Sequence, residues 1–140
     1  MSKKKSDTLW AKKKEENGRF FWLPLSQHLE DTKNIIGLLW EHWLSEGQKK
    51  LIDDSLDSAT YDGGLGKRLA QFLAAVHDIG KATPAFQTQR GFANSDDLDI
   101  QLLEKLEQSG FTKISSLQLS SPKESHHSLA GQYLLSSYGV

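Results

Sequence analysis

The sequence predicts an all-α fold, a helical bundle. Several segments repeat apolar residues at intervals of three and four, which is the spacing of one face of a helix. No segment shows the sustained alternation of apolar and polar residues that is typical of a half-buried strand. A content of 37% apolar residues with four tryptophans can supply a core, and 140 residues correspond to one domain or part of one.

Composition excludes several classes of protein. The chain has no apolar run long enough for a membrane-spanning helix, and no apolar stretch follows its first lysines as in a secretory signal. Without cysteine it can form neither a disulfide nor a thiolate metal site. We therefore expect a cytoplasmic protein without a membrane partner. The net charge of -1 means that nucleic-acid binding would need a local basic patch.

The first 17 residues form a lysine-rich segment with two runs, Lys3 to Lys5 and Lys12 to Lys14. Two interpretations remain open, a solvated chain start and a nucleic-acid contact. Trp10 lies between the runs, which indicates that part of the segment packs. We divide the chain into this segment, residues 1–17, and a helical domain, residues 18–140.

The first helix is predicted to begin at Ser26, an N-cap residue after Pro24, and to end at Gly47. Its apolar residues fall at helical spacing: Leu29, Ile36, Leu39, Trp40 and Trp43. The polar stretch from Asp53 to Gly64 is predicted to be a loop, with or without a short helix.

The strongest helical pattern covers residues 66–79, and its apolar stripe predicts a central, buried helix: Leu69, Phe72, Leu73 and Val76. A short helix from Pro84 through Phe86, capped by Thr83, follows. A surface helix over residues 96–109 turns Leu98, Leu102 and Leu106 inward and stops at Gly110. After a serine-rich loop, residues 111–125, the last helix covers 127–138 with Ala130, Leu134 and Tyr138 on one face.

The pair His77-Asp78 closes the most apolar helix, where burial of such groups is costly unless they are paired. Two interpretations remain open. An imidazole and a carboxylate are suitable ligands for a divalent transition metal, but a histidine at a helix end beside a capping aspartate would look the same. His42, near the end of another helix, fits the helix-dipole interpretation and is not a candidate ligand.

Two further histidines stand at helix starts, His28 in the first helix and His127 in the last. Helix-borne ligands of this kind can converge in a bundle core. Small residues, Ala74 and Ala75 before the pair and Ala130 and Gly131 after His127, allow helices to approach closely.

Lys81, four residues after His77, has two interpretations as well. Beside a metal site it can place a point charge on a phosphate oxygen, and at a helix end it favours the helix dipole.

These residues resemble the HD nuclease domain of the type I CRISPR-associated helicase–nuclease, a branch of the HD superfamily of metal phosphohydrolases. The specific part is "HDIGKATPAFQ", residues 77–87. "LWAKK" and "WLPLSQHLEDT" are similar to the opening of that family, and "HHSLAGQYLL" is similar to its next histidine motif. The register of this last motif favours His127 over His126.

The resemblance implies a metal-dependent endo- or exonuclease that cuts single-stranded DNA in type I CRISPR interference. For the complete domain it implies two divalent metal ions bridged by Asp78, with His28 and His77 on one ion. His127 would help to bind the other ion, together with the family's later histidines. Lys81 would join Asp78 as a catalytic residue by neutralising charge on the phosphate. An imidazole-rich set suits manganese, iron, cobalt or nickel better than magnesium. The implied partners are a helicase domain, in the same or a separate chain, and the RNA-guided Cascade complex.

The chain also departs from that family. The tandem histidine pair and the later aspartate that complete the family's metal site are not present, so we expect the front part of the domain, truncated at its C-terminus. The loss of helices that complete the bundle would expose Leu69, Phe72 and Leu73, and we expect self-association through them. Two alternatives stay open, another HD-type nucleotide or phosphomonoester phosphohydrolase and an inactive helical binding fragment.

Overall fold

The computed structural model describes residues 5–56, 64–91, 97–121 and 124–139. Most of these residues are helical. The chain divides into two compact units: Met1–His28 with Asp78–Val140, and Leu29–His77. None of the described helices is both long and apolar enough to span a membrane.

The first unit contains a two-stranded β-hairpin, so the prediction of an all-α fold is confirmed only in part. Strands β1 (Trp10–Glu16) and β2 (Arg19–Pro24) pair antiparallel. Asn17 and Gly18 join them with positive φ angles of 54° and 73°, as a two-residue turn of type I′ requires. An Asn-Gly pair between two such segments is a strong hairpin signal that the helical reading missed.

An irregularity in β1 explains why the strand pattern is hard to recognise. The register shifts between Trp10, which pairs with Pro24, and Lys12, which pairs with Leu23, so Ala11 is the extra residue of a bulge. In a regular strand, residues three positions apart lie on opposite faces. The bulge instead turns Trp10 to the same face as Lys13. The simple alternation of a regular strand is therefore interrupted.

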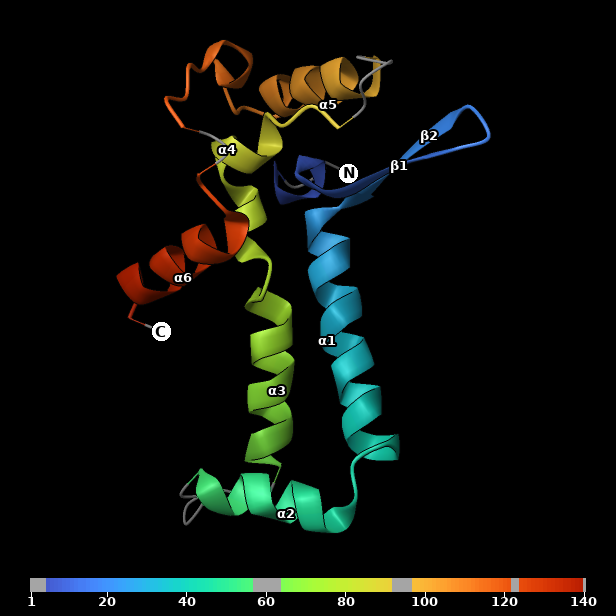
Figure 1. Cartoon of the computed structure of the whole chain (residues 1–140), viewed down its shortest axis with the longest axis vertical. Helices are drawn as coiled ribbons and strands as arrows, with labels where there is room; N and C mark the ends of the chain where they lie inside the picture. The colour runs from blue at the N-terminus through green and yellow to red at the C-terminus, as the bar shows by residue number, and fades with distance from the viewer. Residues whose placement is uncertain (1–4, 57–63, 92–96, 122–123, 140) are drawn as a thin grey trace. The chain divides into compact units, whose positions relative to one another are not determined.

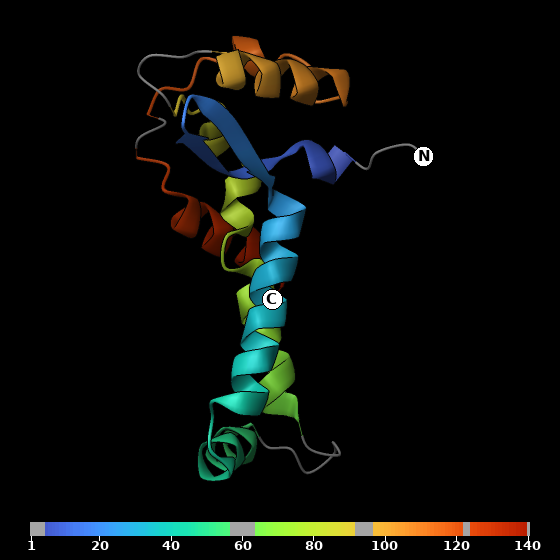
Figure 2. The same ribbon diagram turned by 90° about the vertical axis from the view of Figure 1, so that its right-hand side faces the viewer.

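The face of the hairpin that carries Trp10 and Lys13, here called the inner face, packs on the core of the first unit. Figure 2 shows the hairpin lying beneath α5. The core joins Trp10 and Phe86 to Leu98 and Leu102, with Phe20 and Trp22 packed against it. Lys13 is buried here too. Its ammonium is paired with the carboxylate of Asp99, which offsets the cost of burying both charges.

The helices of the first unit mostly confirm the predictions. Helix α4 (Pro84–Gln87) follows Thr83, and α5 (Asp97–Gln108) buries Leu98, Leu102 and Leu106. Gly110 ends α5 with a φ of 103°. Short 3₁₀ segments η1 (Lys5–Thr8) and η3 (Ile114–Ser116) complete the unit with α6 (His127–Ser137). Of the three residues predicted on one face of this helix, Ala130 and Leu134 are half-buried, whereas Tyr138 is 84% exposed.

The second unit is built on three helices, α1 (Leu25–His42, whose first four residues belong to the first unit), α2 (Glu46–Ser55) and α3 (Leu65–Val76). Figure 1 shows α1 and α3 antiparallel, with α2 between their ends. Gly47 does not end the first helix. The chain turns before it, at Ser45, whose side chain forms a capping box with Gln48 and starts α2. Most of the polar stretch after Ser55 lies outside the described residues.

Close packing inside the second unit depends on glycine. A Cβ at Gly66 would lie 2.5 Å from the Trp40 ring, and the Gly66 amide donates to the Asp53 carboxylate at 2.7 Å. The start of α3 thus lies against Trp40 of α1 at Gly66. The apolar stripe of α3 is not buried as predicted: Leu69 is 36%, Phe72 41% and Leu73 54% exposed.

Candidate metal centre

The backbone leaves the α-helix just before the His-Asp pair. Helix α3 ends at Val76, and the 3₁₀ segment η2 (Ile79–Ala82) follows. Asp78 has φ -111° and ψ 15°, outside the helical region, and its carbonyl accepts the Lys81 amide at 2.9 Å. The prediction that both residues lie on one continuous helix to residue 79 is therefore wrong. This turn directs the Asp78 side chain into the first unit.

The Asp78 carboxylate is buried and meets side chains from three elements. Its Oδ2 lies 2.8 Å from His28 Nε2 of α1 and 2.7 Å from Lys81 Nζ of η2. Its Oδ1 lies 3.2 Å from His127 Nε2 of α6. The structure thus brings together four of the residues predicted from the sequence, although they are up to 99 positions apart (127 minus 28).

Gly80 makes the contact between η2 and α6. A Cβ on Gly80 would lie 1.8 Å from the His127 carbonyl oxygen and 2.5 Å from the Gly131 amide nitrogen. Real Cβ atoms do not approach other atoms this closely, so the backbones can meet only through glycine. The sequence predicted close helix packing at Gly131, and the structure shows that the backbone of Gly80 packs there. This approach places His127 beside Asp78.

Gln87 connects the centre to the start of the hairpin and was not singled out from the sequence beyond its place in the motif. Its side chain is 2% exposed. The side-chain amide donates to the carbonyls of Lys81 and Trp10, both at 2.8 Å, and its oxygen accepts the Trp10 amide at 3.1 Å. Gln87 therefore holds the backbone of Lys81 in place. The buried amide itself is fully hydrogen-bonded.

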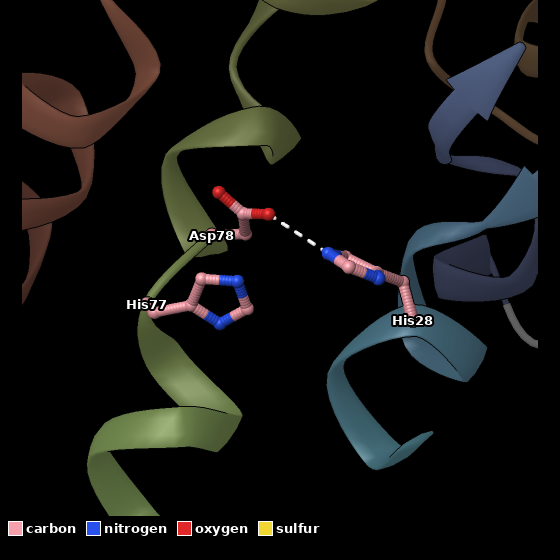
Figure 3. A group of neighbouring side chains, drawn as sticks. All are labelled: His28, His77 and Asp78. Atoms are coloured by element: carbon pink, nitrogen blue, oxygen red, sulfur yellow. Dashed lines mark hydrogen bonds and ion pairs between the residues drawn. The ribbon is translucent and has the colours of Figure 1, made fainter. Parts of the chain in front are cut away.

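His77 lies at the junction of the two units, and its peptide bond joins it to Asp78. Figure 3 shows His77 next to Asp78, its neighbour in the chain, and the Asp78 carboxylate turned toward His28. His77 Nδ1 is 2.7 Å from the Ala74 carbonyl. When Nδ1 donates this bond, Nε2 carries the lone pair that a metal ligand needs. The contact fits the helix-capping interpretation as well, so both interpretations stay open for His77.

His126 and His127 have different surroundings. His126 is the N-cap of α6, and its ring accepts the Ser128 amide. It is exposed and stacks on His127 with the ring centroids 4.5 Å apart. His127, in contrast, contacts Asp78. The geometry agrees with the register that favoured His127.

The pKa of His127 is lowered, first because burial disfavours the charged imidazolium. The Asp78 carboxylate opposes this effect, whereas Lys81 and His126 lower the pKa further. His127 is therefore held in its neutral form, which can donate a lone pair to a cation.

The donor set fits a divalent transition metal. The Nε2 atoms of His28 and His127 each lie against one oxygen of the Asp78 carboxylate, and His77 is the adjacent residue. Nitrogen-rich sets of this kind suit transition metals better than magnesium. His42, which was excluded as a ligand, is in the last turn of α1 with a highly exposed side chain near Glu41.

Comparison with known proteins is consistent with this geometry. The family model described as "Cas3, HD domain" matches residues 10–139. A protein of Streptococcus thermophilus named "CRISPR-associated nuclease/helicase Cas3" is 75% identical over 135 residues, which cover 96% of this chain and 15% of the relative. The chain thus corresponds to a small part of that protein's length. No solved structure matches significantly.

Proposed function

Because the chain belongs to the Cas3 HD-domain family, we propose that it cuts single-stranded DNA by metal-dependent hydrolysis of phosphodiester bonds. The observation that carries this proposal is the buried Asp78 carboxylate, which contacts His28 and His127 from distant helices. A carboxylate with two imidazoles is a ligand set that suits a divalent transition metal, which can catalyse such hydrolysis.

Asp78 would hold two cations in the complete domain. His28 and His77 would help to bind one of them, and His127 would help to bind the other together with the family's later histidines. When bound, the ions supply a hydroxide near neutral pH and neutralise charge on the phosphate oxygens. Manganese, iron, cobalt or nickel suits this set better than magnesium.

Lys81 is proposed to neutralise the phosphate as charge develops on its non-bridging oxygens. Its ammonium lies 2.7 Å from Asp78 Oδ2 and neutralises that buried carboxylate. A role on substrate therefore requires Lys81 to exchange this contact for a phosphate oxygen.

The partners proposed for the whole protein are a helicase domain that supplies single strands and the RNA-guided Cascade complex, in the cytoplasm. The relative's name, nuclease/helicase, supports the first of these. For the 140-residue chain we propose nuclease activity of its own, which the following experiment tests.

The test uses the purified chain with a panel of substrates, namely circular single-stranded DNA, duplex DNA, nucleotides and a phosphomonoester. We expect near-stoichiometric transition metal by elemental analysis, and cleavage of the circular single strand with manganese that Asp78→Asn abolishes. Cleavage of nucleotides alone would favour another HD-type phosphohydrolase. A chain without bound metal or cleavage would instead be a helical binding fragment, and the proposal would be wrong.

A further inference from the structure

The outward face of the β-hairpin carries an excess of positive charge. The register places six side chains on this hairpin outer face, three from each strand: Lys12, Lys14, Glu16, Arg19, Phe21 and Leu23. All except Leu23 are exposed. Three cations and one carboxylate give the face a charge of +2, within a chain whose net charge is -1. The charge is therefore locally concentrated, as binding to nucleic acid would require.

Phe21 stands among these cations with half of its side chain, 50%, exposed. It pairs across the hairpin with Lys14, and Arg19 lies two positions before it on the same face. The core takes its aromatic residues from the opposite face, Phe20 and Trp22. An exposed aromatic ring flanked by cations matches the arrangement that stacks on a base while its neighbours contact phosphates.

We propose that the hairpin outer face binds single-stranded DNA, with Phe21 stacked on a base and Lys12, Lys14 and Arg19 on phosphates. The choice of single-stranded DNA rests on the function proposed above. The positive charge of the face complements the phosphates of DNA. The ion pair between Lys14 and Glu16 is exposed and contributes little stability, so Lys14 can exchange Glu16 for a phosphate.

The hairpin is joined to the candidate metal centre at its open end. Strand β2 continues directly into α1, which carries His28. At the start of β1, the Trp10 amide donates a hydrogen bond to Gln87. Figure 1 shows the strands extending away from that end. At roughly 3.3 Å per residue, strands of this length span about 20 Å. DNA held on the hairpin outer face would therefore be tethered beside the centre.

Binding is measured with the whole chain and fluorescent oligo(dT) in EDTA at low salt, by fluorescence anisotropy. We expect Phe21→Ala to weaken binding roughly 5- to 150-fold through the loss of one stacked base. Lys14→Glu should also weaken DNA binding. It should reduce the steepness of the plot of log K against log salt concentration by about 0.7. The matched control is Lys50→Glu in α2. The two lysine side chains are similarly exposed, 65% for Lys14 and 75% for Lys50, and each has one acidic partner.

The outcomes separate this proposal from the proposed function. Wild-type chain that does not bind oligo(dT), or equal losses in Lys14→Glu and Lys50→Glu, would overturn the role of the face. Equal binding of duplex DNA with the same sensitivity to Phe21→Ala would overturn the preference for single strands. The assay excludes metal, so it measures binding separately from cleavage. A failed nuclease assay therefore leaves this measurement intact.

Discussion

The replacement Gly80→Ala tests the geometry of the centre without touching a proposed ligand. The new Cβ would lie 1.8 Å from the His127 carbonyl oxygen, and real Cβ contacts are not below 3.0 Å, so the backbones must separate by at least 1.2 Å (3.0 minus 1.8). A shift of that size along the contact would carry His127 Nε2 from 3.2 Å to beyond hydrogen-bond distance of Asp78.

Two losses should follow from this separation. Overpacking costs about 1–3 kcal/mol of unfolding free energy. Displacement of one ligand from its position should weaken manganese binding by about 10- to 100-fold, as is usual when the support of a metal ligand is lost. Thermal unfolding measures the first loss and isothermal titration with manganese the second.

Two other glycines serve as controls. A Cβ at Gly47, inside α2, meets nothing within 4 Å, so Gly47→Ala should leave manganese binding unchanged and stabilise its helix by up to ~1 kcal/mol. At Gly131 the nearest atom to a Cβ is the Gly80 nitrogen at 3.2 Å, so Gly131→Ala should have an intermediate effect. If Gly80→Ala binds manganese and unfolds like wild type, the close approach does not position His127 and the reasoning is wrong.

Three further predictions concern other parts of the chain. Gln87→Leu leaves three buried backbone groups without partners and should cost at least about 3 kcal/mol of stability, whereas the exposed Gln89→Leu should change the melting temperature little. Because Leu73 is 54% exposed in an apolar stripe, the chain should self-associate and Leu73→Lys should reduce this; a wild-type monomer in light scattering would contradict it. Ser115 hydrogen bonds lower the pKa of Glu107, so their stabilisation is present at neutral pH and lost as pH falls through that pKa; Ser115→Ala should raise the carboxyl pKa in an NMR titration.

Local patterns were sufficient to predict several helices. The spacing of Leu98, Leu102 and Leu106 predicted which side of α5 is buried, because one helix face depends only on residues three and four apart. Gly110 and Thr83 marked helix ends for similarly local reasons. The hairpin was missed although Asn17-Gly18 signals its turn, because the bulge at Ala11 interrupts the alternation that identifies a strand.

The candidate centre was predictable in part. The motif that contains His77 and Asp78 indicated the residue types, and His28 and His127 were named from their motifs. The direction of Asp78 was not predictable, because it depends on the end of α3 at Val76 and on the turn that follows. The structural role of Gln87 was also missed, since its bonds join residues 77 positions apart.

The amino-acid sequence alone determined the chemistry that this chain can offer: imidazoles, a carboxylate and a lysine in motifs typical of one family. It also determined the helices whose faces repeat locally. Tertiary structure decided which of these groups meet, because the contact between Asp78 and His127 depends on backbones that approach through Gly80 and Gly131. It likewise decided that α3 packs through Gly66 and leaves its apolar stripe exposed. The physical reason is that periodicity reports only neighbours along a helix, whereas burial and coordination depend on residues that are distant in the chain.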